Sequence, residues 1–324
     1  MRHPLLNRFP DRENAFKVFF HPDCLLHEGP AAHPEQPERL KAILEGCLLL
    51  PKRTPVSFDI PQPAGFDQLL VLHDQQYLNR LEEAQHKTTV FMSPDNYLCQ
   101  DSFAAIQASA GCALASGESL LEGVSSFALT RPAGHHAMRS TAEGFCFINN
   151  VALATEIVRC SRPGAKCLIV DFDAHYGNGI DYFYNRDPQV LYYSIHADPD
   201  QIYPHCGFPD ETGRDKGRGT KCNVVVNTGV TGTQWLKTFQ KTLLEFVTKN
   251  TPDFLLVSAG FDAHKEDPLG LMSLTDRHFL NAINLLLEIA DEHCDGISAW
   301  FLEGGYSIPV LKRIVPKVIK KLAR

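Results

Sequence analysis

The chain has 324 residues, of which 44% are hydrophobic and 21% are charged, with 22 Gly and 21 Pro. This ordinary globular composition excludes a fibrous protein, a disordered tail and a disulfide-stapled miniprotein. The balance of 31 Lys and Arg against 38 Asp and Glu gives a formal charge of -7. Because phosphate binding needs a concentrated basic surface, we expect no nucleic-acid partner.

The N-terminal segment and the cysteines favour a reduced compartment inside the cell. Residues 1–11 are polar and interrupted by proline, and no apolar run approaches the roughly 20 residues of a membrane span. Ten cysteines are spread along the chain without a CxxC pair, which is typical of thiols that pack as small apolar side chains. We therefore expect a cytoplasmic protein with no membrane partner. The pattern carries no signal for an oligomeric state.

The predicted elements alternate along the chain. Short apolar runs predict strands at 127–129, 167–170, 190–195, 224–226, 254–257 and 297–302. Segments with helical periodicity lie at 149–159, 234–248 and 276–292, and basic residues between 312 and 324 suit the exposed side of a last helix. Apolar strands that alternate with helices indicate an α/β fold, an open parallel sheet with helices on both faces. Because no linker or repeat divides the chain, we expect one domain over 1–324.

Polar residues follow four of the predicted strands at the point where each strand ends. These segments are 131–136, 171–175, 258–262 and 303–306. In open α/β sheets, ligands bind outside the carboxyl ends of the strands. We therefore expect these four segments, although they are far apart in sequence, to converge on one edge of the sheet.

Asp173, His175 and Asp262 are candidate metal ligands. Asp173 and His175 are two residues apart, so their side chains point the same way in an extended segment, and Asp262 follows another strand. Two carboxylates and one imidazole bind a divalent cation and leave coordination positions for water and substrate. Zn²⁺ is favoured, with Fe²⁺, Co²⁺ or Mn²⁺ as alternatives. From these residues alone, a strand-end turn with capping carboxylates is an equally good interpretation.

Two adjacent histidines and a tyrosine are candidates for acid-base chemistry. His135 and His136 could act as a base and an electrostatic partner near neutral pH, with Asp171 and Asn178 available to their other ring nitrogens. The histidine that faces Asp171 is expected to be the more cationic one. Tyr306 follows two glycines and could donate a hydrogen bond to a developing oxyanion. Taken singly, a His-His pair is more often structural and a Gly-Gly-Tyr more often a packed turn.

Five ordered motifs resemble those of the histone deacetylase and acetylpolyamine amidohydrolase superfamily, and residues 33–39 are similar to that family's start. The motifs are Arg131-Pro132-Ala133-Gly134-His135-His136, Gly144-Phe145-Cys146-Phe147-Ile148-Asn149-Asn150, Asp171-x-Asp173-x-His175-x-Gly177-Asn178-Gly179, Ser258-Ala259-Gly260-Phe261-Asp262 and Glu303-Gly304-Gly305-Tyr306. The resemblance covers nearly the whole chain. It implies the arginase-deacetylase fold and a zinc-dependent deacetylase, with Fe²⁺ or Co²⁺ as alternative ions.

The resemblance also implies roles for individual residues. The residues that match zinc ligands are Asp173, His175 and Asp262. Those that match catalytic residues are His135, His136, Tyr306, Asp171 and Asn178, and asparagine at the last of these is typical of class II enzymes. The tunnel for an acyl-lysine side chain would be lined by Gly144, Phe145 and Tyr203, where the family usually carries Phe at the last position. A structural K⁺ is implied near Asp171, Asp173, His175 and Ser194.

The predicted substrate is an acetyl-lysine side chain in a protein or peptide, from which acetate is released. Leu269 stands where a polyamine-selective relative carries Glu, and Asp95 could hydrogen-bond a peptide backbone. An acetylpolyamine amidohydrolase is the alternative, because residues 194–213 look more like bacterial amidohydrolases. Glu28 and Glu211 would then be candidate ammonium-binding groups, although each suits a solvated surface position better.

Two other classes of protein are disfavoured. An arginase-like binuclear manganese hydrolase needs further bridging carboxylates, which residues 176–178 do not supply. A non-enzymatic module that binds acetyl-lysine or metal would predict a damaged catalytic set. Every matched catalytic position is intact.

Overall fold

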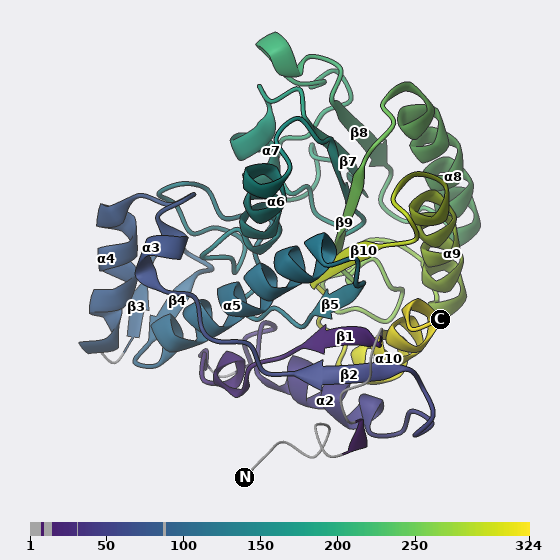
Figure 1. Ribbon diagram of the computed structural model, residues 1–324. Helices are drawn as coiled ribbons and strands as arrows, with labels where there is room; N and C mark the ends of the chain where they lie inside the picture. Colours follow the sequence, from purple (N-terminus) through teal and green to yellow (C-terminus); the bar gives the residue numbers. More distant parts are fainter. Residues whose placement is uncertain (1–7, 10–14, 31, 87–88) are drawn as a thin grey trace.

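The main sheet has eight strands, all parallel, in the order β2-β1-β5-β10-β9-β6-β7-β8. The computed structural model describes residues 8–9, 15–30, 32–86 and 89–324 (Figure 1). The strands are β1 (Phe16–Phe19), β2 (Val56–Asp59), β5 (Ser126–Ala128), β6 (Cys167–Asp171), β7 (Val190–Ala197), β8 (Lys221–Val226), β9 (Phe254–Ala259) and β10 (Ser298–Leu302). The predicted open parallel α/β sheet is therefore confirmed.

Helices cover both faces of this sheet, as predicted. The helices of the chain include α2 (Glu38–Cys47), α3 (Phe66–Leu69), α4 (Gln75–Glu83), α5 (Ser102–Leu121), α6 (Asn150–Ser161), α7 (Asn178–Tyr184), α8 (Gly232–Lys249), α9 (Asp276–His293) and α10 (Ile308–Leu322), of which α3 and α4 lie apart from the sheet (Figure 1). A separate antiparallel hairpin pairs β3 (Thr89–Phe91) with β4 (Tyr97–Cys99). No helix among the described residues combines the length and the apolar character that a membrane crossing needs.

Alternate residues of each strand pack into two different cores. In β9, Leu255 and Val257 belong to the core formed with α2, α8, α9 and α10, whereas Leu256 belongs to the core formed with α5 and α6. Figure 1 shows α8, α9 and α10 on one side of the sheet and α5, α6 and α7 on the other. This double burial explains why the central strands are almost continuously apolar in sequence.

Several elements in the first third of the chain have no predicted counterpart. Strands β1 and β2 have four residues each, which is too short for a clear period of two. Helix α5 is buried on most sides and rich in small residues, so it has no distinct apolar stripe. One of the small residues of α5, Gly117, lets α6 approach closely, because a Cβ atom at this position would lie 2.9 Å from the carbonyl oxygen of Ala154.

The strand order brings the four polar segments together. Strands β5, β10, β9 and β6 are consecutive neighbours in the sheet, and they are the strands that precede residues 131–136, 303–306, 258–262 and 171–175. Because all of these strands run in the same direction, their carboxyl ends meet at one edge. The predicted convergence is confirmed.

Candidate functional site

The three candidate metal ligands meet beyond the carboxyl ends of β6 and β9. Nδ1 of His175 lies 3.2 Å from Oδ1 of Asp173 and 2.9 Å from Oδ2 of Asp262. The ligand atoms of the three residues all lie within 4.8 Å of one another. Burial and the adjacent Asp173 carboxylate raise the pKa of Asp262 to about 7, so a cation bound here would stabilise the ionised pair. This donor set fits a divalent cation.

Backbone groups hold the far side of both carboxylates. Oδ2 of Asp173 accepts a hydrogen bond from the N–H of Gly304, and Oδ1 of Asp262 accepts one from the N–H of Ala174, each at 2.8 Å. These bonds turn the remaining carboxylate oxygens toward His175. Position 304 also requires glycine, because a Cβ atom there would lie 2.6 Å from Oδ2 of Asp173 and 2.7 Å from Oδ2 of Asp262.

The Gly304→Ala variant is expected to bind Zn²⁺ about 10-fold to 100-fold more weakly than the wild type. The added methyl group would displace both carboxylates, which are buried and already held by backbone hydrogen bonds. Competition with a chromogenic zinc chelator measures this without any assay of turnover. Gly65→Ala is the matched control, because its Cβ atom would make only an ordinary contact of 3.6 Å with Gln68. Equal affinity of the Gly304→Ala variant and the wild type would contradict the prediction.

The two adjacent histidines lie in different electrostatic environments. Nδ1 of His135 lies 3.0 Å from Oδ2 of Asp171, and Nδ1 of His136 lies 2.7 Å from Oδ1 of Asn178. Burial lowers the pKa of His135, but the carboxylates of Asp171, Asp173 and Glu303 outweigh burial and raise that pKa to about 10. Burial and the charge of His135 hold the pKa of His136 well below its usual value. His135 is thus the more cationic of the two, in the order that the sequence predicted.

Tyr306 stands in a turn that other side chains fix in place. Gly305 has a φ of 122°, a conformation that favours glycine. Oδ2 of Asp267 accepts hydrogen bonds from the N–H groups of Tyr306 and Ser307, at 2.6 Å and 3.1 Å. Burial raises the pKa of Tyr306 well above its usual value, and the carboxylate of Asp262 adds to this effect. The phenol therefore stays neutral and can donate a hydrogen bond near the ligand cluster.

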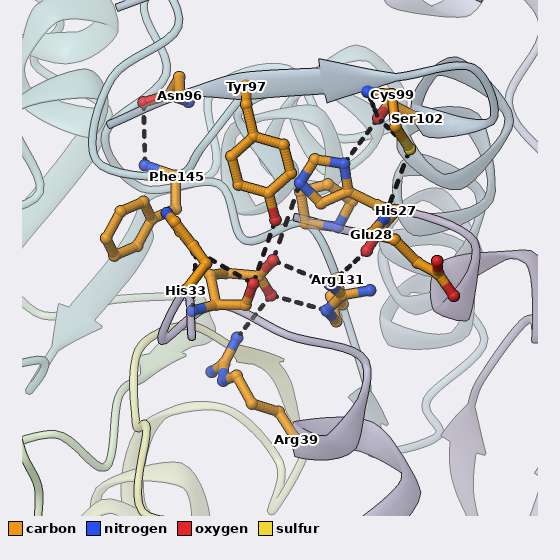
Figure 2. A network of polar contacts seen from close by, with 12 residues as sticks. His27, Glu28, His33, Arg39, Asn96, Tyr97, Cys99, Ser102, Arg131 and Phe145 are labelled. Atoms are coloured by element: carbon orange, nitrogen blue, oxygen red, sulfur yellow. Dashed lines mark hydrogen bonds and ion pairs between the residues drawn. The ribbon is translucent and has the colours of Figure 1, made fainter. Parts of the chain in front are cut away.

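The N-terminal motif supports this turn through a buried charge network (Figure 2). Nε of Arg131 lies 2.7 Å from Oε1 of Glu35, and Nη1 of Arg39 lies 3.2 Å from the same oxygen. Arg39 also donates to the carbonyls of Glu303 and Gly305, and its guanidinium lies 5.1 Å from the centre of the Tyr306 ring. Sequence reasoning assigned these side chains no role, because their partners are up to 266 positions away.

A second group of three potential ligands, His135, Cys146 and Glu303, lies close by. Oε2 of Glu303 accepts hydrogen bonds from the N–H groups of Gly134 and His135, and Oε1 accepts one from Ser258. Burial raises the pKa of the Cys146 thiol well above its usual range, so a thiolate ligand is disfavoured. Glu303 therefore stabilises the turn that carries the histidines, and nothing here favours a second metal ion.

Aromatic residues stand around the cluster where a tunnel was predicted. The ring of Phe145 makes an edge contact with that of Tyr306 at 5.8 Å, and the ring of Tyr203 makes one with that of His136 at 4.9 Å. Gly144, with a φ of 53°, lets the chain pass close to His136, since a Cβ atom there would lie 2.2 Å from its ring. These residues give the cluster apolar walls.

The predicted rim residues differ in their surroundings. Asp95 accepts a hydrogen bond from Ser93 at 2.6 Å within its own turn. Its negative charge makes a small contribution to the raised pKa of Tyr203, which burial mainly causes. Leu269 is 38% exposed, consistent with a rim position. Glu211 accepts a hydrogen bond from the N–H of Gly207 at 3.0 Å in its own loop, and Glu28 is exposed. Neither glutamate contacts the ligand cluster.

The residues predicted near K⁺ include Asp171 at the end of β6 and Ser194 within the neighbouring strand β7. Ser194 pairs in register with Asp171, the last residue of β6. Asp173 and His175 follow Asp171 in the chain. The Ser194 hydroxyl makes a hydrogen bond of 2.9 Å with Nδ1 of His196.

Comparisons with known proteins point to one family. Residues 33–322 match the family model described as histone deacetylase domain. A "Probable deacetylase" of Methanothermobacter thermautotrophicus is 35% identical over 294 residues, which span 90% of this chain and 85% of that protein.

Two solved structures share the fold. The HD domain of HDA15 has a TM-score of 0.90 at 30% identity, covering 96% of this chain and 89% of that chain. The acetylpolyamine aminohydrolase from Burkholderia pseudomallei has a TM-score of 0.84 at 26% identity, covering 95% of this chain and 98% of that chain. With this match over most of its length, the chain belongs to the histone deacetylase and acetylpolyamine amidohydrolase superfamily and is a hydrolytic deacetylase.

Proposed function

We propose that residues 1–324 form one zinc-dependent deacetylase domain that hydrolyses the acetamide of acetyl-lysine in proteins or peptides and releases acetate. The observation that carries the proposal is the position of an uncharged His136 beside the cluster of Asp173, His175 and Asp262, with Tyr306 held nearby. This arrangement supplies a base, a metal site and a neutral hydrogen-bond donor within one buried site.

Asp173, His175 and Asp262 would hold the ion, and Zn²⁺ suits this carboxylate and imidazole set, with Fe²⁺ or Co²⁺ as alternatives. When bound, the ion would polarise the acetamide carbonyl and lower the pKa of a water molecule. We also propose a structural K⁺ near Asp171, Asp173, His175 and Ser194. This ion would help to hold the neighbouring strand ends in place.

The side chains then divide the proton transfers of amide hydrolysis. His136 takes the proton of the attacking water at its Nε2 atom, while Tyr306 donates a hydrogen bond to the acetamide oxygen as negative charge develops there. Cationic His135, paired with Asp171, stabilises that charge electrostatically. When the C–N bond breaks, the proton held by His136 passes to the leaving amine, and the products are acetate and the free amine.

The choice of acetyl-lysine rests on the aromatic residues beside the ligand cluster and on the predicted rim residues. Phe145 and Tyr203 can bury a long alkyl stem at about 0.8 kcal/mol for each methylene. Leu269 offers no charge to a distal ammonium, and Asp95 can accept a hydrogen bond from a peptide N–H. The likeness to the acetylpolyamine aminohydrolase from Burkholderia pseudomallei favours the second candidate, an acetylpolyamine substrate, for which Glu28 and Glu211 would be the ammonium-binding groups.

The deciding measurement is kcat/KM of the zinc-loaded protein on an acetyl-lysine peptide, N-acetylputrescine and N8-acetylspermidine. We expect the peptide to be preferred by at least about 100-fold, which corresponds to about 2.7 kcal/mol of differential transition-state binding. Asp95→Asn should then weaken turnover of the peptide and leave turnover of the polyamines unchanged. A preference of the same size for a polyamine would overturn the acetyl-lysine assignment.

A further inference from the structure

Glu143 is a charged side chain in the site that the mechanism above does not use. Backbone hydrogen bonds in both directions between Glu143 and Cys146, at 3.2 Å and 2.8 Å, close the loop that carries it. Its Oε2 atom accepts two hydrogen bonds, one from Nδ2 of Asn178 and one from the hydroxyl of Tyr203, each at 3.2 Å. One carboxylate oxygen thus joins Asn178, the partner of His136, to Tyr203, whose ring contacts His136.

The carboxylate determines which way the Asn178 amide faces. A carboxylate only accepts hydrogen bonds, so the end of the amide that faces Glu143 must be the NH₂ group. The carbonyl oxygen Oδ1 then faces Nδ1 of His136, 2.7 Å away. A rotation of the amide by half a turn would place its oxygen against the carboxylate, with two acceptors in contact and no proton between them.

The amide in turn determines which nitrogen of His136 carries the proton. A carbonyl oxygen also only accepts, so Nδ1 of a neutral His136 must be the protonated nitrogen. The Nε2 atom is then left with its lone pair, which is the form that a base needs. The opposite tautomer would leave Nε2 protonated and unable to take a proton from water.

We propose that Glu143 is a positioning residue that fixes the Asn178 amide, and through it the tautomer of His136 in which Nε2 is the free base. The second bond to Glu143 anchors Tyr203, whose ring makes an edge contact with His136 at an interplanar angle of 75°. The same carboxylate therefore positions both the Asn178 amide and the Tyr203 ring. The catalytic part of this inference rests on the proposed role of His136, whereas the orientation itself does not.

The test compares Glu143→Leu with Glu143→Gln in the zinc-loaded protein. Leucine removes the acceptor, whereas glutamine keeps an oxygen that can accept from Asn178. We expect kcat to fall about 10-fold to 100-fold in Glu143→Leu, with a change in KM of less than about threefold, and to recover most of its value in Glu143→Gln. In an Asn178→Ala background, Glu143→Leu should cause a much smaller loss of kcat than in the wild type, because the amide is gone and only the bond to Tyr203 is removed.

A measurement that needs no turnover tests the orientation directly. The ¹⁵N chemical shifts of histidine-labelled protein distinguish a protonated ring nitrogen from one with a free lone pair, and the spectrum of His136→Ala assigns the signals. We expect Nδ1 of His136 to be protonated in the wild type and in Glu143→Gln, and both tautomers to be populated in Glu143→Leu. The matched control is Glu118→Gln, which removes an exposed charge near the end of α5, at the opposite edge of the sheet.

Three results would overturn the proposal. The first is an unchanged kcat in Glu143→Leu. The second is a loss of kcat on adding Glu143→Leu to Asn178→Ala that equals its loss in the wild type. The third is an unchanged ¹⁵N signature of His136 in Glu143→Leu. If the wild type hydrolysed no acetyl amide at all, the proposed function would fail. The ¹⁵N signature would still report whether Glu143 sets the tautomer, so the two failures remain distinguishable.

Discussion

The His136→Ala variant is expected to lose about 10²-fold to 10⁴-fold in kcat, the range found when a positioned base is removed. Nδ1 of His136 makes a hydrogen bond with Asn178, and the centre of its ring lies 3.9 Å from that of His135 and 4.9 Å from that of Tyr203. His136 is outside the ligand set of the proposed metal. The loss should therefore appear equally in kcat and kcat/KM, with one zinc ion retained per chain.

Metal content measured on the same sample separates lost chemistry from lost metal. His86→Ala, which changes an exposed histidine outside the site, is the matched control and should keep wild-type turnover. If the His136→Ala variant retained bound zinc and turned over within twofold of the wild type, His136 would not be the base. The same measurements on His135→Ala would then show whether the other histidine fills that role.

The Glu35→Gln variant is expected to lose about 3–5 kcal/mol of stability, the usual cost of removing one partner from a buried ion pair. Glu35 is 1% exposed and is the carboxylate between the guanidinium groups of Arg39 and Arg131. His27 adds little charge at neutral pH, because burial lowers its pKa to about 4. Glutamine would leave two buried guanidinium groups without a counter-ion.

The midpoint of urea unfolding, measured at neutral pH with zinc bound, checks this value. Glu38→Gln is the matched control, because Glu38 is exposed and forms its ion pair with the exposed Lys41, so the change should cost less than about 1 kcal/mol. Burial favours protonation of Glu35, but the two guanidinium groups hold its pKa below the usual 4.5. The difference in the free energy of unfolding between Glu35→Gln and the wild type should thus be largest above pH 4.5 and shrink as the pH falls below that value. A midpoint equal to that of the wild type would refute the prediction.

The residues with direct chemistry could be found from the sequence because each stands in a short motif. Asp173 and His175 are two residues apart at the end of one strand, and His135 and His136 are adjacent. Their residue types restrict the chemistry, whatever the rest of the chain does. Asp171 and Asn178, the partners of the two histidines, stand in such motifs as well, but the more distant groups that hold this set in place could not be found in this way. Glu143, for example, lies 35 positions from Asn178 and 60 from Tyr203.

The same division holds for the fold. Apart from α7, the strands and α-helices from residue 126 onward are expected from short apolar runs and from helical periodicity, because burial of one or both faces leaves a pattern in the sequence. Periodicity says nothing about short or fully buried elements such as β1 and α5. It also says nothing about which strands are neighbours, because pairing depends on packing between segments that are distant in sequence.

By itself, the sequence determined the parallel α/β class and predicted the ligand set and the histidine pair with its tyrosine. The tertiary structure decided that β5, β10, β9 and β6 are neighbours, so that four distant motifs form one site. It also decided how far the pKa of each histidine departs from its usual value, since burial and further charged groups, such as Asp173 and Glu303 beside His135, act together with the predicted partners. Residue types and spacing are properties of the chain, whereas electric fields and hydrogen-bond partners exist only between segments that folding brings together.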